Sequence, residues 1–278
     1  MSGALTPEQS ESLDKFRIEA QKLPDKPEES DEYYLRWLRA RSFNVSASLE
    51  MLKKHLKWRK EVDADKIFDW TPPEVLQKYF PGGFFGEDRD GHPVYYDFYG
   101  NIDTKGFHRS TKKADIIKLK IYHAELTGRI LAEQSKKKGR NLETITAVIN
   151  MENLSYQRQY HWPSIQLARE LFQIFGENYP ERSKSVYIIN APRIFPMVYN
   201  IVKHFIEEDT KQKIVIMGGN WQEELQRYIA PDQLPQAYGG TRCEPDPQCS
   251  AHGNACAHEI IKLKSSNVTV QYIVQGSH

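Results

Sequence analysis

The chain has 278 residues, and its 38 lysine and arginine residues nearly balance its 37 aspartate and glutamate residues, which leaves a formal net charge of +1. This balance argues against bulk binding of nucleic acid, which needs a basic surface. The length suffices for a full core in one or two domains. No apolar run approaches the roughly 18 residues that a membrane span needs, and the start lacks a signal-peptide pattern. All 3 cysteines follow position 242, which gives no disulfide framework. We therefore expect a soluble, cytoplasmic protein.

The N-terminal region predicts a small bundle of helices. Thr6 begins a capping signature, with Pro7 at the first helical position and Gln9 at the third, and this helix should continue to about Lys22. Further helices are expected to start near Asp31, at Ser46 or Ser48, and at the Thr71–Glu74 cap, the last of them ending near Phe80. Each has one apolar face, as a bundle requires.

Strands and helices alternate after a turn expected at Gly82-Gly83. The expected strands are Pro93–Tyr99, Glu143–Met151, Ser185–Asn190 and Lys213–Met217, the last two of them buried, and the expected helices are Lys112–Lys137, His161–Tyr179 and Ile194–Phe205. This alternation is typical of an α/β fold with a mainly parallel sheet. In the second strand, a period of two places Ile145, Ala147 and Ile149 on one face and Thr146, Val148 and Asn150 on the other.

The segment Ile194–Phe205 is more apolar than an ordinary amphipathic helix. Ile194, Val198 and Ile201 fall on one face with Phe205. The residues that widen that face are Phe195, Met197 and Val202. Two interpretations fit this pattern. The helix is either a crossover packed on a parallel sheet, or a lid whose inner face touches an apolar ligand and whose outer face meets a membrane.

Several motifs, in order and with sensible spacing, resemble the CRAL-TRIO lipid-transfer family. They are LRWLRARSF at Leu35–Phe43, YPER at Tyr179–Arg182, YIINAP at Tyr187–Pro192, the phenylalanine-rich helix that leads to KIVI at Lys213–Ile216, and LPQAYGGT at Leu234–Thr241. The resemblance covers about Leu5 to Thr241. The sequences of the first motif and of the EPDPQC tail look most similar to the supernatant protein factor, or tocopherol-associated, branch of the family.

The resemblance implies an N-terminal helical segment over residues 1–80 and a lipid-binding domain over residues 81–241. In this family the sheet forms the floor of an apolar lipid cavity, and the helix that matches Ile194–Phe205 is the gate of that cavity. The implied pocket residues are Tyr95, Ile145, Ala147, Ile149, Phe172 and Phe175, and the implied gate residues are Ile194, Phe195, Val198, Ile201, Val202 and Phe205. The ligand would be one phospholipid or hydrophobic small molecule, exchanged during transient contact with a membrane.

The resemblance also carries over an inositol-headgroup site, at Arg41, Glu181, Thr210 and Lys213. Arginine suits phosphate because its fork donates two hydrogen bonds. The alternative is that these charges form structural ion pairs. Choline-lipid binders of the family have hydroxyl residues where this chain has Ile145 and Ala147, and neither of these side chains can hydrogen-bond a phosphate. The resemblance therefore implies that a ligand other than phosphatidylinositol would be more apolar than phosphatidylcholine.

Other motifs allow more than one interpretation. Lys136–Lys138 with Arg140 is either a solvated helix end or a contact for anionic lipid. Gly82-Gly83 and Gly86 lack the following lysine of a nucleotide loop. Cysteines and histidines after Thr241 have no standard zinc spacing. We therefore expect no metal and no cofactor. Residues 242–278 should be a linker and the possible start of a truncated β-sandwich.

The predicted function is binding of phosphatidylinositol or of a tocopherol- or squalene-like lipid, and its transfer at membranes, with no catalytic residue. A rival class is a hydrolase on a doubly wound sheet, but the sequence has no G-x-S-x-G elbow. Another is a lipid-sensing scaffold without net transport. Protein partners are not indicated by the sequence.

Overall fold

The computed structural model describes residues 5–25, 30–80, 82–155, 161–206 and 208–242, and the backbone of residues 263–265 and 268–270. The chain forms two compact units. The helical unit comprises Met1–Trp70 together with Gln173–Arg182, and the sheet unit comprises Thr71–Phe172 together with Ser183–His278. The predicted domain boundaries at residues 80 and 241 stay predictions.

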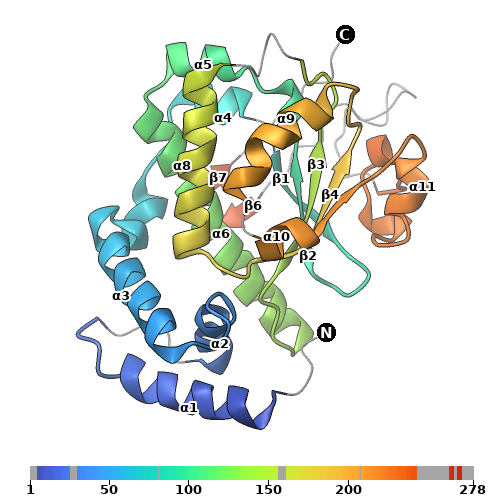
Figure 1. The fold of residues 1–278 in the computed structure, drawn as a ribbon. Coiled ribbons are helices and arrows are strands. Elements are labelled where there is room, and N and C mark those ends of the chain that lie inside the picture. The colour runs from blue at the N-terminus through green and yellow to red at the C-terminus, as the bar shows by residue number, and fades with distance from the viewer. Residues whose placement is uncertain are drawn as a thin grey trace. The chain divides into compact units, whose positions relative to one another are not determined.

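The helical unit contains α1 (Pro7–Ala20), α2 (Asp31–Arg39), α3 (Val45–Glu61) and the 3₁₀ helix η1 (Ala64–Asp69) (Figure 1). The capping box predicted at Thr6 is confirmed, because the Thr6 side chain accepts from the Gln9 amide and the Gln9 side chain accepts from the Thr6 amide. The third helix starts earlier than predicted, since Asn44, not a serine, caps the amide of Ala47.

The core of the helical unit joins α1, α2 and α3. Phe16, Trp37, Leu38 and Leu52 are fully buried in it, and Phe16 packs edge-on against Tyr34. The fourth predicted helix, α4 (Glu74–Tyr79), belongs to the sheet unit, so the bundle was predicted one helix too large. Its predicted cap was also wrong, because Pro73 precedes the helix and makes no side-chain cap.

The sheet has five strands in the order β1-β2-β3-β4-β5. They are β1 (Gly82–Glu87), β2 (Pro93–Asp97), β3 (Ile145–Asn150), β4 (Ser183–Ile189) and β5 (Ile214–Ile216). β2 to β5 pair in parallel, and β1 pairs antiparallel with β2. The predicted mixed α/β class with a mainly parallel sheet is confirmed.

Two predictions about strands were wrong. Gly82-Gly83 lies inside β1 and not in a turn, and Gly82 takes a φ of 147° that suits glycine alone. β5 was predicted to be buried, but it forms the edge of the sheet, where Val215 and Ile216 are 36% and 50% exposed. A continuous apolar run is therefore not enough to distinguish a central strand from an edge strand.

Helices connect the parallel strands. They are α5 (Thr104–Ser110), α6 (Lys113–Lys138), α8 (Trp162–Asn178), α9 (Phe195–Val202) and α10 (Glu208–Gln212), with the 3₁₀ turns η2 (Tyr99–Asn101) and η3 (Lys203–Phe205). After β5 follow α11 (Trp221–Leu225) and the 3₁₀ turns η4 (Pro231–Gln233) and η5 (Gln236–Tyr238). α5 was not predicted from the sequence. Figure 1 shows α9 and α11 on opposite sides of the sheet.

One face of the sheet is filled by the segment that follows β5. We call it the packed face; it carries Val94, Tyr96, Thr146, Val148, Tyr187 and Ile189. Leu225, Ile229 and Leu234 are fully buried against it. Tyr238 completes this core with its ring 5.1 Å from that of Tyr96. The opposite face, which carries Tyr95, Ile145, Ala147 and Ile149, we call the half-buried face.

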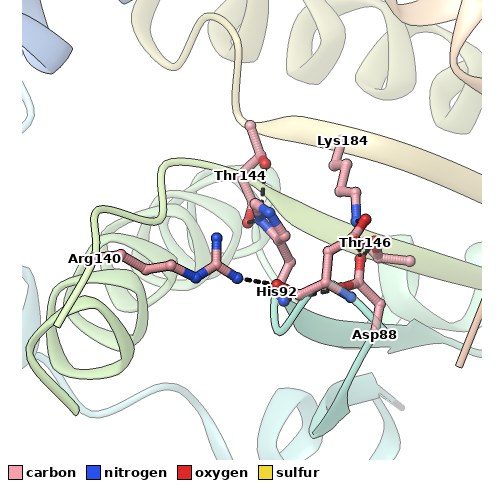
Figure 2. A network of polar contacts seen from close by, with 7 residues as sticks. Asp88, His92, Arg140, Thr144, Thr146 and Lys184 are labelled. Carbon is pink, nitrogen blue, oxygen red and sulfur yellow. Dashed lines mark hydrogen bonds and ion pairs between the residues drawn. The ribbon is translucent and has the colours of Figure 1, made fainter. Parts of the chain in front are cut away.

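A polar network ties together the starts of the parallel strands (Figure 2). The buried Asp88 carboxylate accepts from Thr146 Oγ1 at 2.7 Å and from Lys184 Nζ at 2.7 Å. His92 Nδ1 lies 2.9 Å from the carbonyl oxygen and 3.0 Å from the hydroxyl of Thr144. These contacts join the β1–β2 turn to β3 and β4, so they satisfy a charge that would be costly to bury alone.

The basic cluster after α6 is partly built into this corner. Lys138 pairs with Glu87 at 2.8 Å, and Arg140 donates to the Asp90 carbonyl oxygen. Part of the cluster therefore has a structural role. The tail contributes β6 (Leu263–Ser265) and β7 (Val268–Val270), which pair antiparallel; the predicted cysteine- and histidine-rich segment lies outside the described residues.

Candidate functional site

The central strand β3 buries its polar face more completely than its apolar face. Thr146, Val148 and Asn150 are 1%, 0% and 6% exposed. Ile145, Ala147 and Ile149 remain half-buried, although they occupy the middle strand of the sheet. Apolar side chains at such a position are normally buried in a close-packed core. The half-buried face is therefore the natural candidate for contact with an apolar ligand.

Helix α9 covers one end of this face. Phe195 is 4% exposed and packs in a cluster with Met151 and Ile188, and Ile149 and Val198 border that cluster. The other predicted gate residues, Ile194, Ile201, Val202 and Phe205, are half-buried. The helix ends at Val202, and Lys203–Phe205 continues as a 3₁₀ turn. Met197 on its outer side is 56% exposed.

A small pocket lies beside α5, α6 and α8. It encloses about 100 Å³ and is lined mostly by apolar side chains. Its apolar lining includes Phe80, Phe107, Leu167, Ala168 and Leu171. Its polar lining residues are Tyr99, Thr104, His108, Lys120 and Ser164. None of the pocket residues predicted from the sequence lines it. Its volume is below the roughly 300 Å³ at which ligand pockets usually begin, so it has room for part of a lipid and not for a whole one.

The six pocket residues predicted from the sequence are buried to a similar extent, but they belong to two different units. All six, Tyr95, Ile145, Ala147, Ile149, Phe172 and Phe175, are half-buried. Phe175 belongs to the helical unit, and the rest belong to the sheet unit. Tyr95 packs edge-on against Phe84 at 5.1 Å and lies 6.4 Å from the ring of His123. Their role as a ligand pocket stays a prediction.

Sequence reasoning missed a charged pair next to the small pocket. Asp97 Oδ2 lies 3.7 Å from Lys120 Nζ, and this ammonium sits 4.4 Å above the ring of Phe80. Burial raises the pKa of Asp97, and burial together with the Asp97 charge raises the pKa of Tyr99 to about 12. Among the described residues Asp97 Oδ1 has no hydrogen-bond partner. The sequence did contain one signal for this pair, because Asp97 is an acid at the end of the otherwise apolar strand β2.

The predicted headgroup residues also divide between the units. Arg41 and Glu181 belong to the helical unit, and Thr210 and Lys213 belong to the sheet unit. Arg41 Nη1 donates to the Ala40 carbonyl oxygen at 2.7 Å, and Glu181 has a φ of 56°. The Lys213 amide donates to the Thr210 carbonyl oxygen at 3.1 Å, which places these two residues together. All four side chains are half-buried.

In the part of the chain that the structure describes, no helix is long and apolar enough to span a bilayer. Over those same residues no group of three or more histidine, cysteine, aspartate or glutamate side chains is arranged to hold a metal ion.

Comparison with known proteins gives a consistent picture. The CRAL/TRIO domain matches residues 77–240. The chain is 32% identical over 248 residues to the CRAL-TRIO domain-containing protein T23G5.2 of Caenorhabditis elegans, with 86% of this chain and 34% of the relative covered. It is 32% identical over 245 residues to Protein real-time of Anopheles gambiae, with 86% and 36% covered.

The chain thus spans about a third of the length of these relatives. The crystal structure of Sfh5 shares the fold, with a TM-score of 0.71 over 91% of this chain and 94% of that one, at 19% identity. The domain match and the identity to the relatives together show that this chain belongs to the CRAL-TRIO family.

Proposed function

We propose that this chain encloses one hydrophobic ligand, either phosphatidylinositol or a tocopherol- or squalene-like lipid, and exchanges it at membranes. Membership of the CRAL-TRIO family supports lipid binding and transfer in general. The observation that carries the proposal is the inverted burial of β3, whose apolar side chains Ile145, Ala147 and Ile149 stay half-buried while its polar ones are buried. A ligand on that face would complete the burial.

Enclosure matters because exposing a lipid tail to water is costly. Each methylene contributes about 0.8 kcal/mol, so a tail of about 16 carbons costs on the order of 10 kcal/mol. A protein that offers an apolar chamber at the bilayer lowers the barrier to transfer. No covalent bond is made or broken in this exchange, and the proposal includes no enzymatic activity.

Helix α9 is the proposed gate. Its inner side chain Phe195 is buried against the sheet, and its outer side chain Met197 is exposed. Such a helix has apolar side chains on both sides, as a lid that moves between the sheet and a bilayer requires. Peripheral contact with a membrane from the cytoplasm follows from this proposal.

For an inositol phospholipid, Arg41 and Lys213 would bind the phosphate. The Glu181 carboxylate would accept hydrogen bonds from the inositol hydroxyls, and the Thr210 hydroxyl would donate or accept one. The test uses Glu181→Ala and Lys213→Ala. Each should lower phosphatidylinositol loading several-fold and leave loading of tocopherol unchanged. Lys211→Ala is the matched control, because Lys211 pairs with Glu208 on the surface. Equal loss of both ligands, in protein that circular dichroism shows to be folded, would contradict this site.

The rival proposal is a lipid-sensing scaffold that binds a partner without net transport. The two are separated by transfer of fluorescent phosphatidylinositol between vesicles with no other protein present. Transfer above the spontaneous rate supports the transporter. Stoichiometric loading without transfer would favour the scaffold. The assignment to the supernatant protein factor branch likewise stays a proposal.

A further inference from the structure

The loop that follows α8 is held by the N-terminal helices within the helical unit. This loop, Tyr179–Arg182, lies between α8 and β4 in the sequence but belongs to the same compact unit as α1, α2 and α3. It contains Glu181, which the proposed function assigns to the inositol headgroup. The residues that hold the loop therefore decide where that carboxylate lies.

Arg36 makes the most unusual of these contacts. It is only 5% exposed, although arginine is rarely so buried. Its Nε donates to the carbonyl oxygen of Pro180 at 3.3 Å, across 144 positions of sequence. Its guanidinium carbon also lies 5.5 Å from the centre of the Tyr33 ring. A buried guanidinium in contact with a backbone carbonyl has little freedom, because moving it would leave a charge without compensation.

The neighbouring residues fix the start of the loop. His55 Nδ1 lies 3.2 Å from Asn178 Oδ1, and both side chains are 4% exposed. The side-chain amide nitrogen of Asn178, Nδ2, in turn donates to the Ile174 carbonyl oxygen at 3.0 Å. The Tyr179 ring stands edge-on to Trp58 at 5.8 Å. Together with the contact from Arg36 to Pro180, these contacts anchor the end of α8 and the first two residues of the loop.

The residue after Pro180 has a backbone conformation that needs such support. Glu181 has a φ of 56°, in the left-handed region that side chains other than glycine, asparagine and aspartate rarely adopt. A non-glycine residue stays there only where surrounding contacts determine its position. The carbonyl that Arg36 holds belongs to the peptide bond that enters this residue, so the contact acts directly on the direction in which Glu181 projects.

We propose that Arg36 is a positioning residue for inositol-lipid selection, which holds the Pro180 carbonyl and thereby sets the Glu181 carboxylate for the headgroup. The inference rests on the proposed function. It gives the N-terminal helices a part in choosing the ligand, through Arg36 and the loop.

The test compares Arg36→Gln, Arg36→Lys, Glu181→Ala and the double variant Arg36→Gln/Glu181→Ala. Loading of phosphatidylinositol and of tocopherol from mixed vesicles is measured by native mass spectrometry, alongside the melting temperature. Arg36→Gln should lower phosphatidylinositol loading about tenfold, the scale of one lost hydrogen bond to a charged group. Tocopherol loading should stay within about twofold of the unsubstituted protein, since it needs no headgroup contact.

Two further results distinguish positioning from general support. The double variant should load phosphatidylinositol no worse than Glu181→Ala alone, because both changes remove one interaction. Arg36→Lys should recover part of the loading, since lysine can also donate to the carbonyl. If Arg36→Gln does not fold, the ratio of the two ligands in Arg36→Lys decides the question. Arg17→Gln is the control, because Arg17 pairs with Asp14 and Asp31 at the surface of the same unit.

Equal loss of both ligands in Arg36→Gln, or additive losses in the double variant, would overturn the inference and leave Arg36 with a purely structural role. A different result would show that the proposed headgroup site itself is wrong. In that case the unsubstituted protein takes up tocopherol and no phosphatidylinositol, and the role proposed for Arg36 falls with it.

Discussion

The packed face of the sheet and its half-buried face differ in what lies against them. On the packed face, Val148 and Ile189 are fully buried beneath the segment that follows β5. On the half-buried face, Ile188 is buried near α9, but Ala147 and Ile145 in the middle strand are not. One face is thus built for stability, and the other retains apolar surface that a ligand can cover.

The largest effect should come from shortening matched isoleucines on the two faces. Ile189→Ala should cost about 4 kcal/mol of unfolding free energy, because it removes a fully buried side chain from a close-packed cluster. Ile149→Ala should cost about 1 kcal/mol, because that side chain is half-buried. Urea unfolding of the ligand-free protein measures both. Equal costs would contradict the distinction between the faces.

A pH effect comes next, from a buried histidine close to Tyr95 on the half-buried side. Burial lowers the pKa of His123 to about 3 from its usual 6.5. The unfolded chain therefore binds the proton first, and stability is full above pH 6.5 and falls as the pH drops toward 3. At a pH of about 4.5 the loss should reach about 3 kcal/mol.

The measurement is the unfolding free energy between pH 7 and 4.5 for the original protein and for His123→Phe, which retains an aromatic ring beside Phe80 and Tyr95. The variant should show a flatter profile. An unaltered slope in His123→Phe would show that this ring is not the group that titrates.

Replacing two neighbouring residues of β3 with phenylalanine should affect stability on the packed face and lipid loading on the half-buried face. Val148→Phe overpacks the buried cluster and should cost about 3 kcal/mol. Ala147→Phe points toward the half-buried face and should cost less than about 1 kcal/mol, while it lowers lipid loading at least tenfold by filling the ligand space. Melting temperature and lipid extraction measure the two effects. Full lipid loading of Ala147→Phe would place the ligand elsewhere.

The smallest effect on stability should come from the outer side of α9. Met197→Ser should change the unfolding free energy by less than about 0.5 kcal/mol, because Met197 is exposed. It should nevertheless weaken binding to vesicles several-fold in a sedimentation assay, since an apolar anchor is lost. Ile18→Ser on α1 is a matched control, with the same 56% exposure. Equal weakening by both would argue against α9 as the membrane contact.

The sequence predicted those features that depend on local pattern. The Thr6 capping box, the alternation along β3 and the apolar helix after Pro192 were all visible in the spacing of residue types. β1 was missed because Gly82-Gly83 is a turn signal in most contexts, and only the pairing with β2 makes it a strand. The exposed position of β5 depends on strand order, which periodicity does not encode.

The candidate site was less accessible to sequence reasoning. Apolar residues of the half-buried face could be assigned from their period of two, and Asp97 stood out as an acid on an otherwise apolar strand, but its partner Lys120, 23 positions later in α6, has no local signature. The contact from Arg36 to Pro180 spans a still longer separation. Long-range polar contacts of this kind follow from tertiary packing, which a single sequence does not specify.

The most direct test of the central claim is native mass spectrometry of the purified protein after incubation with mixed liposomes, with the bound molecule extracted and identified. The account predicts one lipid per chain, at near-full occupancy, and its loss in Ala147→Phe. A folded protein that remains empty after contact with liposomes, or that carries several lipids which Ala147→Phe does not displace, would contradict it.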